Sequence, residues 1–178
     1  TLITGDAIQP GDKVYGFKSS GLHTNGYSLA RKILLEEQGL SVDSHVDELG
    51  CTVAEELLKV HRSYLPVLEK AIDTGLVKGL AHITGGGFLD NIPRVLPDGV
   101  SVEIRQAAVP HLPVFDYLVE RGKVSLEEAY RVFNMGIGMV AMVGADKEDA
   151  FLHAVTEKPV LLGEVVPGDG TVHMVGDA

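Results

Sequence analysis

The sequence predicts an α+β domain in which helices are layered on a mixed or antiparallel sheet. Strand-type and helix-type runs follow one another without the strict alternation that a parallel α/β sheet requires. The run 135–143 is apolar on both faces, as expected of a strand buried in the middle of a sheet. A chain of 178 residues is long enough for one well-filled core but short for two.

The first half of the chain predicts one strand and then helices. Apolar residues recur at helical spacing after a polar, glycine-punctuated loop, and Thr52 with Glu55 forms a capping box. Pro66 fits only the first turn of a helix or a kink. The expected elements are a strand over 12–18, a helix from Tyr27 to a stop at Gly39, and two helices or one bent helix from Thr52 to Gly75.

The second half predicts most of the strands. Val100, Val102 and Ile104 alternate with polar residues, which predicts a strand with one solvent-exposed face, and Ser125 with Glu128 forms a second capping box. The expected strands cover 77–83, 100–105, 135–143, 160–166 and 171–175, and the expected helices cover 88–97, 113–122, 125–133 and 147–155.

Composition narrows the class of protein. Apolar residues make up 45% and charged residues 22%, which is ordinary for a globular domain and excludes a disordered tail. With 15 basic against 25 acidic residues the net charge is −10, so we expect neither nucleic acid nor a membrane surface as a partner. No segment has the form of a membrane helix or secretion signal, which predicts a cytoplasmic protein.

The first residues of the sequence predict that the chain is one domain of a longer protein. Residue 1 is Thr, and the opening residues have the character of a connection. We therefore expect residues 1–11 to be a linker from a missing N-terminal domain and residues 12–178 to be the domain itself. Cys51 is the single cysteine, so an internal disulfide is excluded.

The first candidate binding motif is His82-Ile-Thr-Gly-Gly-Gly87, with Asn91 shortly after it. Consecutive glycines between a strand and a helix allow backbone N–H groups to converge on an anion beside the positive end of the helix. Thr84 could add a hydroxyl. Phosphate is the natural ligand, and the alternative is that the glycines only make a tight turn.

The second motif, Ser19-Ser-Gly-Leu-His-Thr-Asn-Gly-Tyr27, concentrates hydroxyl, imidazole and carboxamide groups on one loop. Such groups can bind a polar substrate, and an imidazole such as His23 ordinarily titrates close enough to neutrality to exchange protons. The alternative is local: Thr24 or Asn25 caps the following helix and the serines make turns.

The third motif, Phe133-Asn-Met-Gly-Ile-Gly-Met139, places Asn134 and two glycines at the start of the apolar strand. Backbone can approach a ligand or a neighbouring strand closely there, and packing is the simpler explanation. Elsewhere, the histidines lack the spacing of metal ligands, so we expect no metal site in the chain. Those histidines are His45, His61, His111, His153 and His173.

Taken together, these motifs resemble the C-terminal domain of the phosphoribosylformylglycinamidine cyclo-ligase family, also called aminoimidazole ribonucleotide synthetases. The resemblance covers essentially the whole chain and rests on three separated motifs in the same order. Related synthetases and kinases share the two-domain plan, but their sequences at the first two motifs differ from this one. One small departure is Thr24, where many relatives have Ser, and the hydroxyl is kept.

The resemblance implies an α+β domain with partial ferredoxin-like topology, joined in the complete enzyme to an N-terminal domain that builds a homodimer and carries much of the ATP and Mg²⁺ site. It implies ATP-dependent closure of formylglycinamidine ribonucleotide to aminoimidazole ribonucleotide, with ADP and phosphate as the other products. The isolated chain is then expected to be inactive and to bind no cofactor tightly.

The resemblance also implies roles for particular residues. His23 is the best candidate for proton transfer or amide polarisation, and Asn134 is a weaker candidate that supports the site. The residues expected to contact phosphate, substrate or nucleotide are Ser19, Ser20, Thr24, Asn25, Thr84, Gly85, Gly86, Gly87 and Asn91.

Two other functions remain open at the level of sequence. The chain could be a stand-alone module that holds a phosphorylated metabolite without reacting it, or the same domain of a related ATP-dependent synthetase or kinase. In each case we expect the loops 19–25 and 85–87 to face one site, because both leave strands and enter helices.

Overall fold

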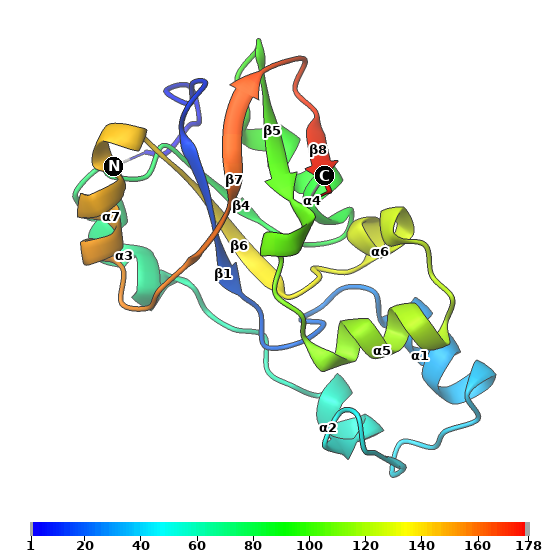
Figure 1. Ribbon diagram of the computed structural model, residues 1–178. Helices are drawn as coiled ribbons and strands as arrows, with labels where there is room; N and C mark the ends of the chain where they lie inside the picture. Colours follow the sequence, from blue (N-terminus) through cyan, green and yellow to red (C-terminus); the bar gives the residue numbers. More distant parts are fainter. Residues whose placement is uncertain (1, 177–178) are drawn as a thin grey trace.

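A computed structural model describes residues 2–176 and shows one mixed sheet of six strands in the order β4-β6-β1-β7-β5-β8 (Figure 1). Neighbouring strands are antiparallel except β5 and β8, which are parallel. The predicted α+β class is therefore confirmed. The strands are β1 (Lys13–Lys18), β4 (Gly79–His82), β5 (Val100–Arg105), β6 (Ile137–Val143), β7 (Val160–Pro167) and β8 (Val172–Val175), and β2 (His45–Val46) pairs separately with β3 (Cys51–Thr52).

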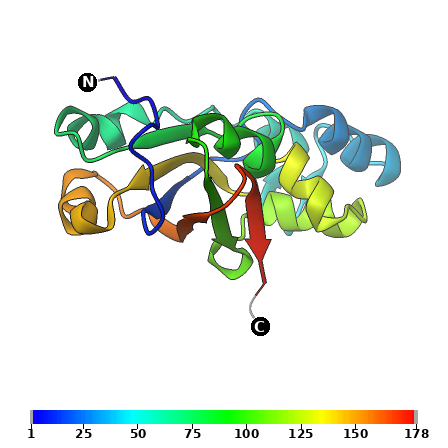
Figure 2. The same cartoon turned by 90° about the horizontal axis from the view of Figure 1, so that it is seen from above.

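The helices gather at two ends of the sheet. Figure 2 shows α3 and α7 at one side and α1, α5 and α6 at the other. Several helices are extended by single turns of other helical types, such as the π-helical segment Lys32–Glu37 after α1. The α-helices are α1 (Tyr27–Arg31), α2 (Val53–Leu57), α3 (Leu65–Asp73), α4 (Gly87–Asn91), α5 (Pro113–Arg121), α6 (Leu126–Val132) and α7 (Glu148–Ala154).

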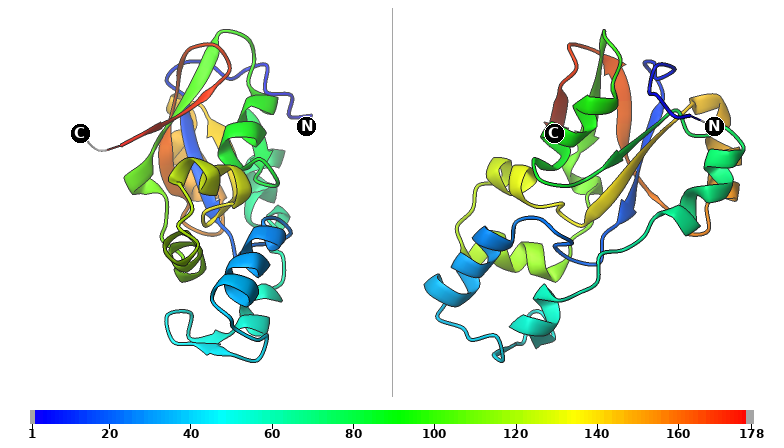
Figure 3. Two further views of the ribbon diagram at one scale, coloured as in Figure 1. Left: turned by 90° about the vertical axis from the view of Figure 1, so that its right-hand side faces the viewer. Right: turned by 180° about the vertical axis from the view of Figure 1, so that it is seen from behind.

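Two apolar cores cover the two faces of the central strands. On β1, Val14 belongs to one core, whereas Tyr15 and Phe17 belong to the other, because successive side chains of a strand point to opposite faces. Strand β6 lies between β4 and β1 and contributes side chains to both cores in the same way. This confirms the buried interior strand that the apolar run 135–143 predicts. The edge-on view in Figure 3 shows helices on more than one side of the sheet.

Most predicted elements are present, with local differences. The Thr52 capping box is complete, whereas at Ser125 only the backbone N–H of Glu128 bonds to the cap hydroxyl. The helical periodicity up to Gly75 becomes two helices, α2 and α3. Strand β5 does not have the fully exposed face that alternation predicts, because Ser101 is buried and bonds to the turn at Asp169 that leads into β8.

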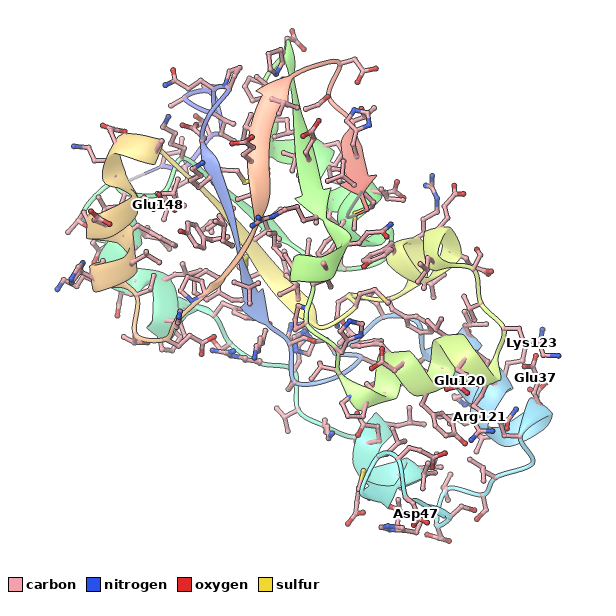
Figure 4. All side chains as sticks on the ribbon, in the orientation of Figure 1. Glu37, Asp47, Glu120, Arg121, Lys123 and Glu148 are labelled. Carbon is pink, nitrogen blue, oxygen red and sulfur yellow. The ribbon has the colours of Figure 1, made fainter. Side chains whose placement is uncertain are left out.

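One group of charged side chains lies at the end of α5. Figure 4 shows Glu37, Glu120, Arg121 and Lys123 together where α5 ends beside the first helix, and Arg121 pairs with Glu48 at 2.9 Å. Among the described residues, none of the helices has the length and apolar character required to cross a bilayer.

One ion pair is buried at the start of the sheet, and it supplies a test of the fold. Asp12 is 2% exposed and accepts hydrogen bonds from Lys78 Nζ at 2.7 and 2.8 Å and from the backbone N–H of Gln9. Replacing Asp12 removes the only carboxylate that Lys78 pairs with among residues 2–176, so Asp12→Ala leaves an uncompensated charge.

We expect Asp12→Ala to lower the free energy of unfolding by about 2–3 kcal/mol, somewhat below the usual cost because Lys78 reaches solvent. The matched control is Glu164→Ala, which breaks the exposed pair with Lys13 and is expected to cost no more than about 0.5 kcal/mol. Denaturant unfolding of both variants measures the difference. Equal losses in the free energy of unfolding would show that the Asp12–Lys78 pair stabilises the fold no more than an exposed pair does.

Candidate functional site

The three sequence motifs meet at one edge of the sheet. Strands β1 and β4 are each antiparallel to β6, so they run in the same direction and their carboxyl ends lie at the same edge. Lys18 pairs with Ile137 and His82 with Met139, which places both strand ends beside the first residues of β6. The loops that follow β1 and β4, and the turn that precedes β6, are therefore neighbours.

Asn134 joins the turn before β6 to the loop after β1. Its buried carboxamide donates from Nδ2 to the carbonyl oxygens of Gly21 and Leu22, at 2.7 and 3.3 Å. Its Oδ1 accepts from the Ser19 hydroxyl and the Gly136 N–H, both at 2.8 Å. Asn134 thus holds the backbone of the loop in place.

The glycine loop after β4 is held from within. The Thr84 hydroxyl donates to Asn91 Oδ1, while Asn91 Nδ2 donates to carbonyl oxygens of the loop, including that of Gly87 at 2.8 Å. A Cβ at Gly87 would lie 1.7 Å from the Tyr130 carbonyl oxygen, so Gly87 is required by backbone packing. Thr84 and Asn91 thus hold the loop by hydrogen bonds, and Gly87 allows the close backbone packing.

The backbone N–H groups of Gly85 and Gly86 remain available to a ligand. The Gly87 N–H is used by the Thr84 carbonyl oxygen, but within residues 2–176 the N–H groups of Gly85 and Gly86 have no acceptor. A Cβ on Gly85 would meet a single group, Asn25 Oδ1, at 3.6 Å. The loops 19–25 and 85–87 therefore lie against each other, as the sequence predicts.

The loop after β1 does not form the local helix cap that was the alternative to a binding role. Gly26, in a left-handed conformation, is the residue before α1, and no side chain caps that helix. Thr24 is exposed, and Asn25 Nδ2 is buried with no partner among the described residues. The capping alternative for Thr24 and Asn25 is thus wrong.

His23 lies inside this loop and is 3% exposed, with φ at 60°. Its Nε2 meets both the backbone N–H and the hydroxyl of Ser20 at 3.1 Å, and that hydroxyl donates to the Val60 carbonyl oxygen. Burial lowers the pKa of His23 to about 4, with His61 the next cause. The expectation that His23 titrates close to neutrality is therefore corrected, because the ring is buried within its loop.

Two further histidines complete the surroundings of His23: His61, which the sequence spacing discounts, and His82, which opens the first motif. The His61 ring stacks on the His23 ring, with centroids 4.1 Å apart, and His61 Nε2 lies 3.1 Å from His82 Nε2. His61 comes from the segment between α2 and α3, and no short motif marks it. Only the tertiary structure shows that it belongs to the site.

The segment 58–64 also forms hydrogen bonds where β1 ends and its loop begins. Arg62 Nη1 and Tyr64 Oη both donate to the Lys18 carbonyl oxygen, at 3.0 and 2.9 Å. A Cβ at Gly138 would lie 2.1 Å from Tyr64 Oη and 2.7 Å from His23 Cε1, so the second glycine of the third motif leaves room for both rings. Packing is therefore the role of Gly138.

Residues 9–176 match the family model described as AIR synthase related protein, C-terminal domain. The chain belongs to this family. The match spans all three motifs.

The curated relatives agree with the family. The chain is 45% identical to phosphoribosylformylglycinamidine cyclo-ligases of Geobacillus thermodenitrificans over 172 residues and of Shouchella clausii over 174 residues. These matches cover 95% and 96% of this chain and 50% of each relative. The chain therefore spans about half the length of the curated relatives it matches.

A solved structure shares the fold of the family at low identity. The thiamine-monophosphate kinase of Stenotrophomonas maltophilia K279a superposes with a TM-score of 0.59 and 16% identity, over 99% of this chain and 54% of the kinase chain. This likeness concerns the fold alone.

The hydrogen bonds of Asn134 generate a prediction about stability. Asn134→Ala would leave buried carbonyl and N–H groups of the loop without partners, and each such group costs roughly 1–3 kcal/mol. We expect a total loss of about 3 kcal/mol in the free energy of unfolding. Asn25→Ala is the matched control, expected to change stability by no more than about 0.5 kcal/mol because Nδ2 has no partner in residues 2–176. Thermal unfolding of both variants measures the difference. An Asn134→Ala variant as stable as the Asn25→Ala control would contradict the structural role of Asn134.

Proposed function

We propose that this chain is the C-terminal half of a phosphoribosylformylglycinamidine cyclo-ligase. The complete protein would close formylglycinamidine ribonucleotide to aminoimidazole ribonucleotide with ATP, and release ADP and phosphate. The observation that carries the proposal is the meeting of the three motifs at one sheet edge, in a chain 45% identical to curated cyclo-ligases over 95% of its length.

The chemistry needs an anion site, and the glycine loop suits it. Gly85 and Gly86 present backbone N–H groups without acceptors in the described residues, beside the carboxamide of Asn25. Backbone donors held in place before a ligand arrives cost little reorganisation when charge develops. We therefore assign a phosphate group of the substrate or of ATP to Gly85 and Gly86, with Asn25 and Thr24 as polar contacts.

His23 suits the reacting amide as a fixed hydrogen-bond donor. Because Nε2 accepts the Ser20 N–H, the proton of the neutral ring resides on Nδ1, which is buried and has no partner among residues 2–176. An Nδ1–H in this position can donate to the formyl oxygen as that oxygen gains charge. His23 therefore polarises the amide in our proposal, and a proton-transfer role is less well supported.

The described residues offer no all-protein cage for magnesium. Mg²⁺ prefers carboxylate, carbonyl and water oxygens, and residues 2–176 contain no cluster of three or more carboxylates. ATP and Mg²⁺ ligands would come from the other half of the complete protein. The isolated chain is accordingly proposed to have no turnover, and the complete protein to be a homodimer, as the family resemblance implies.

The glycine loop can be tested without disturbing the fold. Gly85 has no positive φ and room for a Cβ, which would project toward Asn25 where the ligand is proposed to lie. We expect Gly85→Ala in the complete protein to raise KM for a phosphate-bearing substrate at least tenfold, about 1.4 kcal/mol, with an unchanged melting temperature. Gly176→Ala is the matched control, because a Cβ there meets nothing within 4 Å. Unchanged KM values for both substrates would remove Gly85 from the site.

His23 can be tested with two substitutions. His23→Ala is expected to reduce turnover of the complete protein by about 10²- to 10⁴-fold, and also to lower the melting temperature because the ring is buried. His23→Asn keeps an N–H near the Nδ1 position and tolerates the positive φ, so part of the turnover should return. Equal activity per folded molecule in the wild type and His23→Ala would exclude a role in the reaction.

The reaction itself is tested by assaying the complete protein for ATP-dependent formation of aminoimidazole ribonucleotide. Binding of the substrate without product would instead support a phosphometabolite-binding module. Phosphorylation of a substrate without ring closure would support a related kinase.

A further inference from the structure

We propose that His23, His61 and His82 form a binding site for one divalent transition-metal ion of the zinc type. One ring nitrogen from each histidine lies within 4.8 Å of the others, although the three residues are far apart in the sequence. They belong to the loop after β1, the segment between α2 and α3, and the end of β4. The proposal concerns ion binding and does not depend on the reaction proposed above, and an ion on His23 Nδ1 would displace the Nδ1 proton that the proposed reaction uses.

The spacing is close to what a tetrahedral ion requires. With metal–nitrogen bonds of 2.0–2.1 Å, two tetrahedral nitrogen ligands lie about 3.3 Å apart. His61 Nε2 and His82 Nε2 are already 3.1 Å apart. The nitrogen lone pairs of two stacked rings run nearly parallel and cannot converge on one ion. The His61 ring therefore has to rotate away from the His23 ring when the ion binds. His61 is half-buried and His82 is exposed, so both side chains have the freedom to close on His23.

His23 has one nitrogen to spare for the ion. Nδ1 is buried and lacks a partner among residues 2–176, whereas Nε2 faces Ser20. Binding the ion requires the ring proton to move from Nδ1 to Nε2, so that Nε2 donates to the Ser20 hydroxyl and gives up the Ser20 backbone N–H as a donor. The Nδ1 lone pair is then available to the ion. A histidine ligand that donates its other N–H in this way is fixed in the tautomer that the metal needs. Ser20 would therefore act as a positioning residue.

The ligand set selects the class of ion. Neutral imidazole suits zinc, copper, nickel and cobalt, whereas magnesium and calcium prefer oxygen ligands. Three protein ligands leave a fourth position open, as in zinc sites that bind water or a substrate group. The exposed side of His82 is where that position would reach solvent.

The experiment uses the chain prepared without a histidine tag and titrated with Zn²⁺ or Co²⁺ alone. We expect one ion per chain by calorimetry, and a tetrahedral visible absorption band with Co²⁺. A tenfold excess of Mg²⁺ should displace neither ion. His61→Ala and His82→Ala should each weaken binding by at least about 10²-fold, since loss of a ligand exceeds the roughly 10–100-fold effect of an outer partner, and Ser20→Ala should weaken it by about tenfold.

His111→Ala is the matched control, because its side chain is 80% exposed and pairs with Asp116 away from the cluster. It should bind Zn²⁺ as the wild type does. Circular dichroism of each variant confirms that the fold is kept. The proposal is overturned if the wild type binds no stoichiometric ion at micromolar Zn²⁺, if His61→Ala binds as tightly as the wild type, or if His111→Ala loses the ion.

Discussion

The hydrogen bonds of the Asn134 carboxamide are the constraint on which the site depends. They fix the carbonyl groups of the loop after β1 against the turn that begins β6. A carboxamide has two donors and an acceptor with two lone pairs, and here both ends of the group are used. No apolar side chain of similar volume could satisfy the same buried backbone groups, so the loop conformation depends on this one residue type.

The direction of the strands brings the loops of the site together. Because β6 is antiparallel to both β1 and β4, two loops separated by some sixty residues reach the same edge. The segment 58–64 is hydrogen-bonded to the end of β1 and to the loop that follows it. The Val60 carbonyl oxygen accepts from the Ser20 hydroxyl, and Arg62 and Tyr64 donate to the Lys18 carbonyl oxygen. Hydrogen-bonding groups that remain without partners in the described residues, at His23, Asn25, Gly85 and Gly86, are consequently gathered in one place.

Much of this could be predicted from sequence, and the omissions have physical causes. Periodicity and capping residues locate most elements, and the apolar run 135–143 indicates a strand covered on both faces. The roles inside the site depend on tertiary contacts. Thr84, Asn91 and Ser19 look like ligand-binding groups in the sequence but donate or accept bonds that hold the loops. His61 has no motif around it, and His23 is buried by residues distant in sequence, so neither its environment nor its pKa follows from local spacing.

The coverage of β1 and β6 on both faces has a consequence for how the domain opens. The two cores share the backbone of these strands, so neither core can come apart without exposing a strand that the other still holds. Local opening should then be confined to the periphery, such as the short β2–β3 hairpin and the parallel edge strand β8. The amide hydrogens of β1 and β6 would exchange with solvent only when the whole domain unfolds. The loops of the site are anchored at the ends of these slowest-exchanging strands, which keeps their geometry tied to global stability.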